Sequence, residues 1–146
     1  MAELNEVAQT LDDVKDFTPL QRILLTATGT LQGVLSAYFG QEVRVVVREQ
    51  EAEDRWVVHR VADLMAGELV VCHADSKITL TLDKVRDEVL AKEMGIGQIL
   101  EALEIRPTFR LLEVGRGNGA FWRLYELEGP GVVYRITETF PEGLYI

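Results

Sequence analysis

Near its end the chain reads Val132-Val133-Tyr134-Arg135-Ile136-Thr137-Glu138-Thr139-Phe140-Pro141. Large apolar and polar residues alternate there with the period of two that is typical of a β-strand, so we predict a strand over 132–140. Glu138 then lies on the same face as Tyr134, Ile136 and Phe140. Because desolvation disfavours a carboxylate, Glu138 must reach a partner or a polar ligand there, or bend out to water from an edge strand.

The rest of the chain carries similar signals for strands and helices. Thr18-Pro19 is typical of a helix start, with a hydroxyl cap followed by a proline that has no N–H to satisfy. The patterns predict helices over 19–28 and 31–39, from 83 to about 95 and over 96–103, and strands over 42–49, 56–65, 68–80, 108–115, 121–128 and 132–140. We therefore expect an α+β fold with roughly six antiparallel strands and the helices grouped on one side of the sheet.

The length of the chain and the positions of its turn and cap residues indicate its domain organisation. The sequence of 146 residues predicts an N-terminal arm over 1–17 and a single domain over 18–146 with a substantial core. No internal repeat is visible. The glycine-rich segment 115–119 lacks the features of a phosphate-binding loop, and we expect a mobile connection or a flap there.

Composition narrows the possible partners and location. The net charge of −9, without a basic stretch, argues against nucleic acid and anionic membranes as partners. The single cysteine, Cys72, excludes an internal disulfide and lies in an apolar run, which indicates core packing. Without a membrane-length apolar run or a signal peptide, the sequence favours a cytoplasmic protein. The oligomeric state stays open.

Five segments, taken in order, resemble the chorismate pyruvate-lyase family. They lie between residues 18 and 146 and read Leu20-Gln21-Arg22-Ile23-Leu24-Leu25, Gly95-Ile96-Gly97-Gln98-Ile99-Leu100, Leu112-Glu113-Val114-Gly115-Arg116, Trp122-Arg123-Leu124-Tyr125, and the closing Thr137-Glu138-Thr139-Phe140-Pro141. The resemblance implies a chorismate-lyase-like fold and the elimination of pyruvate from chorismate to give 4-hydroxybenzoate. It also implies that no metal and no redox cofactor is needed.

The resemblance further implies a site in which a cation and a carboxyl group face one small carboxylated ligand. Glu138 matches the family's carboxyl residue. The carboxylate anchor falls on Arg60 when counted from Ala74-Asp75-Ser76, and on His59 when counted from the Gly67 hairpin; we prefer Arg60, because its planar fork binds a carboxylate with two hydrogen bonds. Candidates for the apolar wall are Leu64, Met65, Leu80, Leu112, Trp122 and Tyr134.

Departures from the family pattern leave other functions open. Gln32-Gly33 stands where the family has an arginine, and Gly95 replaces its proline. One alternative is a related enzyme of a specialised pathway, such as a cyclase or isomerase that acts on another cyclic or carboxylated metabolite. Another is a non-catalytic domain that binds a small ligand. His59 and His73 do not have the spacing of metal ligands.

Overall fold

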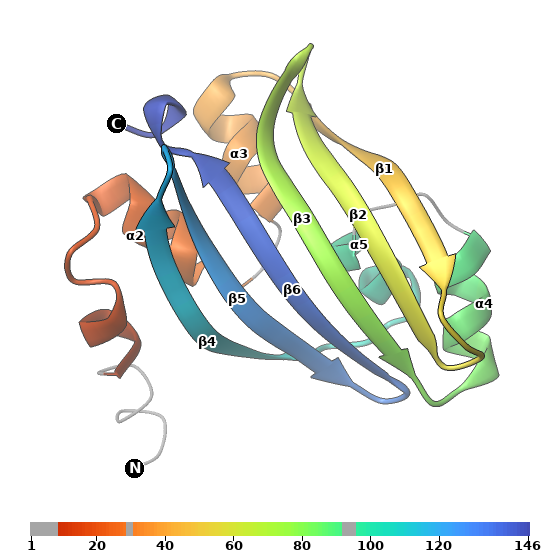
Figure 1. The fold of residues 1–146 in the computed structure, drawn as a ribbon. Helices are drawn as coiled ribbons and strands as arrows, with labels where there is room; N and C mark the ends of the chain where they lie inside the picture. Colours follow the sequence, from red (N-terminus) through yellow and green to blue (C-terminus); the bar gives the residue numbers. More distant parts are fainter. Residues whose placement is uncertain (1–8, 29–30, 92–95) are drawn as a thin grey trace.

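A computed structural model describes residues 9–28, 31–91 and 96–146 as an α+β fold built on one open sheet (Figure 1). All neighbouring strands are antiparallel, in the order β1-β2-β3-β6-β5-β4. The six strands are β1 (Val43–Ala52), β2 (Val57–Ala66), β3 (Leu69–Leu80), β4 (Thr108–Gly117), β5 (Ala120–Gly129) and β6 (Val132–Pro141). The predicted fold class and all six predicted strands are confirmed.

Helices cover only one face of this sheet. In Figure 1 the sheet faces the viewer and the α-helices lie behind it. They are α2 (Pro19–Thr26), α3 (Leu31–Phe39), α4 (Asp83–Ala91) and α5 (Ile96–Ala102), and a short 3-10 helix, η1 (Glu142–Leu144), follows β6. In the part of the chain that the structure describes, no helix has the length and apolar character needed to cross a membrane.

The fold contains the same unit twice, although the sequence shows no repeat. Two helices and a three-stranded meander, α2-α3-β1-β2-β3, are followed by the same order of elements, α4-α5-β4-β5-β6. The two meanders join through the antiparallel pair β3 and β6 at the centre of the sheet. Arg60 is the fourth residue of β2 and Arg123 is the fourth residue of β5, so the two arginines occupy equivalent places in the two units.

Two apolar clusters fill the space between the sheet and the helices. The first packs α2 and α3 on the Phe121 end of the sheet, and the second packs α4 and α5 on the Tyr125 end. Val14 and Phe17, which precede α2, are buried in the first cluster. Cys72 lies in the same cluster, and burial raises the pKa of its thiol well above the usual value, in agreement with the predicted packing role.

The segment 115–119, expected to be a mobile connection or a flap, connects β4 to β5 and forms the tip of a tight hairpin. Gly117 pairs with Ala120, and Asn118 and Gly119 have φ of 54° and 75°. Two successive residues with positive φ are what a type I′ turn requires, and Asn-Gly is the preferred pair for it. The glycines therefore shape regular antiparallel pairing in a connection between two strands, while its mobility and a role as a flap stay predictions.

Gly115 makes room for a tryptophan on the neighbouring strand. It pairs with Trp122, and a Cβ atom added to Gly115 would lie 2.1 Å from the indole ring. The indole therefore covers the glycine on the exposed face of the sheet, where it shields this part of the backbone from water.

We predict that Gly115→Ala lowers the free energy of unfolding by about 1–3 kcal/mol, because the indole of Trp122 must move out of its place. Gly117→Ala is the matched control, since a Cβ atom there meets nothing within 4 Å, and it should change stability by less than about 0.5 kcal/mol. Urea denaturation of both variants measures the difference. Equal losses would contradict this account of the Gly115 contact.

Candidate functional site

The covered face of the sheet carries a line of buried polar side chains between the two apolar clusters. On β5, Phe121 belongs to the first cluster and Tyr125 to the second, with Arg123 between them. On β6, Glu138 likewise lies between Phe140 and Ile136. Charged side chains buried in this way need partners, and these partners decide what the residues can do.

Glu138 is 6% exposed and receives one hydrogen bond at each carboxylate oxygen. Arg123 Nε donates to Oε1 at 2.7 Å, and the Tyr125 hydroxyl donates to Oε2 at 2.9 Å. Burial, aided by the negative charge of Glu138, raises the pKa of Tyr125 well above its usual value, so the phenol keeps the proton that it donates. Glu138 is therefore a hydrogen-bond acceptor on the face predicted from the alternation of the strand.

Arg123 also binds the end of a helix from the other unit. Its Nη1 donates to the carbonyl oxygens of Leu25, at 3.2 Å, and of Ala27, at 2.7 Å, at the C-terminal end of α2. The guanidinium carbon lies 4.3 Å from the centre of the Tyr125 ring. The last carbonyls of a helix have no partner within it and carry partial negative charge, so a cation is stabilised there.

Arg60 makes the corresponding contact in the opposite direction. It is 1% exposed, and its Nε donates to Gln50 Oε1 at 2.8 Å. Its Nη2 donates to the carbonyl oxygen of Val89, at 3.0 Å, near the C-terminal end of α4. Each half of the fold thus contributes a buried arginine that donates hydrogen bonds near the C-terminal end of a helix in the other half.

The expected closeness of Arg60 and Glu138 is realised only in part. Both side chains are buried on the covered face, but β3 lies between their strands. Ser76 pairs with Arg60, and Ala74 pairs with Glu138, so the two β3 residues between them are small. Glu138 forms its ion pair with Arg123, and Arg60 lies on the other side of β3.

Tyr134 and Leu80, two of the candidates for the apolar wall, lie on the same face of the sheet as Glu138. Both belong to the second apolar cluster, as does Ile78, the β3 residue that pairs with Tyr134. Within the described residues, the Tyr134 hydroxyl is fully buried and has no hydrogen-bond partner. Burial raises its pKa to about 12 although the charge of Arg60 opposes the shift, so Tyr134 is a protonated donor close to Arg60.

Three other candidates lie away from this site. Trp122 and His59 project from the opposite, exposed face, because each directly precedes a buried residue of its strand, Arg123 or Arg60. Leu112 is 36% exposed at a β-bulge of β4. None of the three can share a pocket with Glu138, so the alternative of His59 as carboxylate anchor is corrected. Leu64 and Met65 are buried.

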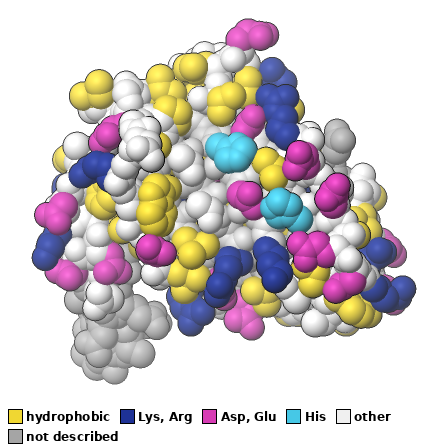
Figure 2. All heavy atoms as spheres, viewed as in Figure 1, with side chains coloured by type: hydrophobic (Ala, Val, Ile, Leu, Met, Phe, Trp, Pro, Cys, Tyr) yellow, Lys and Arg dark blue, Asp and Glu magenta, His cyan; other side chains and the backbone are white. Residues whose placement is uncertain are grey.

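The exposed face of β2 and β3 carries both histidines, each paired with an aspartate (Figure 2). His59 Nε2 lies 2.8 Å from Asp75 Oδ1, and this hydrogen bond raises the pKa of the imidazole. His73 Nδ1 lies 2.6 Å from Asp63 Oδ1. Both histidines thus take part in polar pairs between the neighbouring strands β2 and β3.

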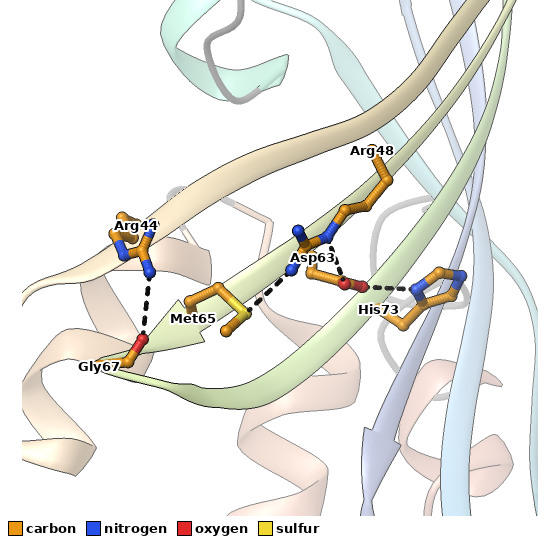
Figure 3. Close-up of polar contacts among 6 residues, drawn as sticks. All are labelled: Arg44, Arg48, Asp63, Met65, Gly67 and His73. Carbon is orange, nitrogen blue, oxygen red and sulfur yellow. Dashed lines mark hydrogen bonds and ion pairs between the residues drawn. The ribbon is translucent and has the colours of Figure 1, made fainter.

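A short chain of contacts extends the second pair toward β1 (Figure 3). Arg48 Nε donates to Asp63 Oδ2 at 3.0 Å, and Arg48 Nη2 lies 3.8 Å from the sulfur of Met65. Burial opposes the ionisation of Asp63, but the hydrogen bonds from His73 and Arg48 outweigh it and leave the pKa of Asp63 lowered. Within the described ranges, no group of three His, Cys, Asp or Glu residues is placed to hold a metal ion.

Sequence reasoning missed Arg123 and Tyr125 as partners of Glu138. Phe121, Arg123, Tyr125 and Leu127 alternate with outward residues in the same way as the residues around Glu138. A charged residue at an inward position of an apolar strand was therefore available as a signal on β5. The pairing of Arg123 with Glu138 had no such signal in the sequence, because it depends on β5 lying beside β6.

Comparison with known proteins adds no family assignment. No protein-family model matches the chain, and a search of curated proteins finds no match.

We predict that Glu138→Gln lowers the free energy of unfolding by about 3–5 kcal/mol, because the amide leaves the buried charge of Arg123 without a counterion. Glu128→Gln is the control, since Glu128 is an exposed glutamate of the neighbouring strand, and it should shift stability by less than about 0.5 kcal/mol. Urea denaturation near neutral pH measures both. A Glu138→Gln variant as stable as the control would show that the charge pair contributes little.

We also predict that the imidazole of His59 titrates above its ordinary pKa of about 6.5. The hydrogen bond to Asp75 raises the folded-state pKa, so its contribution to stability is present below the unfolded-state pKa and is lost as pH rises through the folded-state pKa. NMR titration of the ring protons measures the shift. Asp75→Asn should bring the pKa down, and an unchanged titration in that variant would assign the shift to another cause.

Proposed function

We propose that the protein is a cofactor-independent carbon–oxygen lyase that releases pyruvate from chorismate and leaves 4-hydroxybenzoate. The ordered resemblance of five sequence segments supports this, and so does the six-stranded antiparallel sheet with helices on one face, which suits a chorismate-lyase-like fold. The observation that carries the proposal is the covered-face arrangement of Arg60, Tyr134 and Glu138 around the small residues Ala74 and Ser76.

In this proposal Arg60 binds the ring carboxylate of the substrate. Gln50 and the carbonyl of Val89 hold the guanidinium in a fixed orientation, so little conformational entropy is lost when the ligand binds. The Tyr134 hydroxyl, buried close to Arg60, supplies a second donor for the anionic ligand. Ile136, an apolar residue of the second cluster that lies between Tyr134 and Glu138 on the covered face of β6, contacts the ring.

The reaction needs substrate orientation and the movement of one proton. The ether bond between the ring and the enolpyruvyl group breaks, and the electron pair stays with the departing oxygen. The hydrogen on the neighbouring hydroxyl-bearing ring carbon leaves as a proton, and the methylene carbon of the enolpyruvyl group gains one, which gives pyruvate and an aromatic ring. Glu138 accepts a hydrogen bond from the ring hydroxyl, since a carboxylate has acceptor sites beyond the two that Arg123 and Tyr125 use.

A second candidate is a domain that binds a carboxylated cyclic ligand without converting it. The observation that favours it is that protein donors already engage both Glu138 oxygens. Such a carboxylate is a good orienting group and a poor proton donor. The same site would also suit a lyase relative that acts on another cyclic carboxylic acid.

We predict pyruvate formation from chorismate above the spontaneous rate, measured in a coupled lactate dehydrogenase assay with purified protein. Calorimetry with 4-hydroxybenzoate provides the second readout. Binding without pyruvate formation would support the binding domain, and absence of both would contradict a chorismate site.

Arg60 variants test the anchor in the same assays. Arg60→Ala should weaken binding of 4-hydroxybenzoate by about 1.5–3 kcal/mol, the usual range for hydrogen bonds to charged groups. Arg60→Lys should restore only part of the loss because it lacks the planar fork. Arg110→Ala, at an exposed arginine, is the control, and melting temperatures show whether the contact of Arg60 with α4 has been lost. Unchanged affinity in Arg60→Ala would exclude Arg60 as anchor.

A further inference from the structure

A cavity of about 630 Å³ opens beside Leu100 and Leu127 of the second apolar cluster. It lies between Thr28, just after α2, and the segment that connects α5 to β4. Its lining includes neither Arg60 nor Glu138, so it is separate from the site proposed above. Its volume is in the range of pockets that hold small organic ligands.

The inner wall of the cavity is apolar. Leu100 and Leu127 are 3% and 9% exposed, and both belong to the second apolar cluster. Ile105 packs against the same cluster and lines the cavity together with Pro107. An apolar ligand body placed against this wall would lose water-exposed surface, which is favourable.

The polar part of the lining carries more negative than positive charge. Glu101, Glu104 and Arg106 all line the cavity and are exposed. Within the described residues, none of these three side chains makes a hydrogen bond or an ion pair. Two carboxylates against one guanidinium, in a protein with a net charge of −9, attract a cation more than an anion.

Glu104, in the lining of the cavity, follows α5 in a left-handed backbone conformation. Its φ is 57°, a left-handed value at the end of α5 that glycine adopts more readily than glutamate. Two backbone hydrogen bonds fix this helix end, from Ile105 N to Leu100 O at 2.9 Å and from Glu104 N to Glu101 O at 3.0 Å. Glu104 thus takes the left-handed position that commonly closes a helix, and this fixes its place in the lining of the cavity.

We propose that this cavity binds a small amphipathic amine, with its apolar body against Leu100 and Leu127 and its ammonium group at Glu101 and Glu104. Recognition of the head group by two carboxylates makes the amine essential. A ligand of similar shape with a carboxylate instead would meet two like charges and only one favourable partner, Arg106.

Isothermal titration calorimetry with phenethylamine tests the proposal, with 3-phenylpropionate and methylammonium as comparison ligands. Phenethylamine should bind most tightly, because 3-phenylpropionate lacks the ammonium group and methylammonium lacks the apolar body. The Glu101→Gln/Glu104→Gln double variant should weaken phenethylamine binding at least about tenfold, which is about 1.4 kcal/mol. Glu68→Gln, which changes an exposed glutamate in the β2–β3 hairpin, should leave it unchanged.

A blocking variant tests the location. Gly97 lines the cavity, and a Cβ atom added there meets nothing within 4 Å, so a side chain can start from this position without a clash. We expect the ring of Gly97→Phe to occupy part of the cavity and to abolish phenethylamine binding. Circular dichroism and melting temperature check that the variant folds. Tighter binding of 3-phenylpropionate would overturn the charge assignment, and full phenethylamine binding in folded Gly97→Phe would overturn the location. Pyruvate release from chorismate should persist in these variants, so the two proposals fail separately.

Discussion

The structure depends on two buried arginines that link its halves. Arg123, from the second unit, binds carbonyl oxygens at the end of α2, and Arg60, from the first, binds a carbonyl oxygen near the end of α4. Each guanidinium offers donors where a helix leaves acceptors unsatisfied, so both desolvation costs are offset at one place. The exchange ties α2 to β5 and α4 to β2, each a strand of the other half, and it keeps buried charges between the two apolar clusters.

The buried polar side chains between the two apolar clusters, among them Arg60, Arg123 and Glu138, are also suited to chemistry. A buried charge pair adds little net stability compared with an apolar replacement, so the Arg123–Glu138 pair fits a role in orienting groups as well as in stability. Arg123 and Tyr125 orient Glu138, while Gln50 orients Arg60. Groups held in this way are preorganised for a ligand. The exposed face of the sheet has the opposite character, because its His–Asp pairs are accessible to water and contribute weakly.

The sequence was most informative where a local pattern decides the structure. Thr18 caps α2 in a capping box with Gln21, and alternation placed Glu138 on the covered face, both as predicted. Asn118-Gly119 is an equally local signal for a hairpin turn, and it was overlooked because of the glycines around it. The partner of Glu138 could not be predicted, since Arg60 and Arg123 both occupy inward strand positions and only the order of strands in the sheet distinguishes them. His59 and Trp122 were misplaced because one residue along a strand reverses the face.

The central pairing of β3 with β6 has a consequence for how the chain folds. Within each meander the paired strands are neighbours in sequence, so these contacts close short loops and can form early. Leu80 and Val132, by contrast, pair across a stretch that contains two helices and two strands. The entropy lost in closing a loop grows only slowly with its length, so this late step is not prohibitive once each meander is formed. The β3–β6 pair is thus where two locally formed meanders become one sheet, and hydrogen exchange would show whether the amides on its two sides lose protection together.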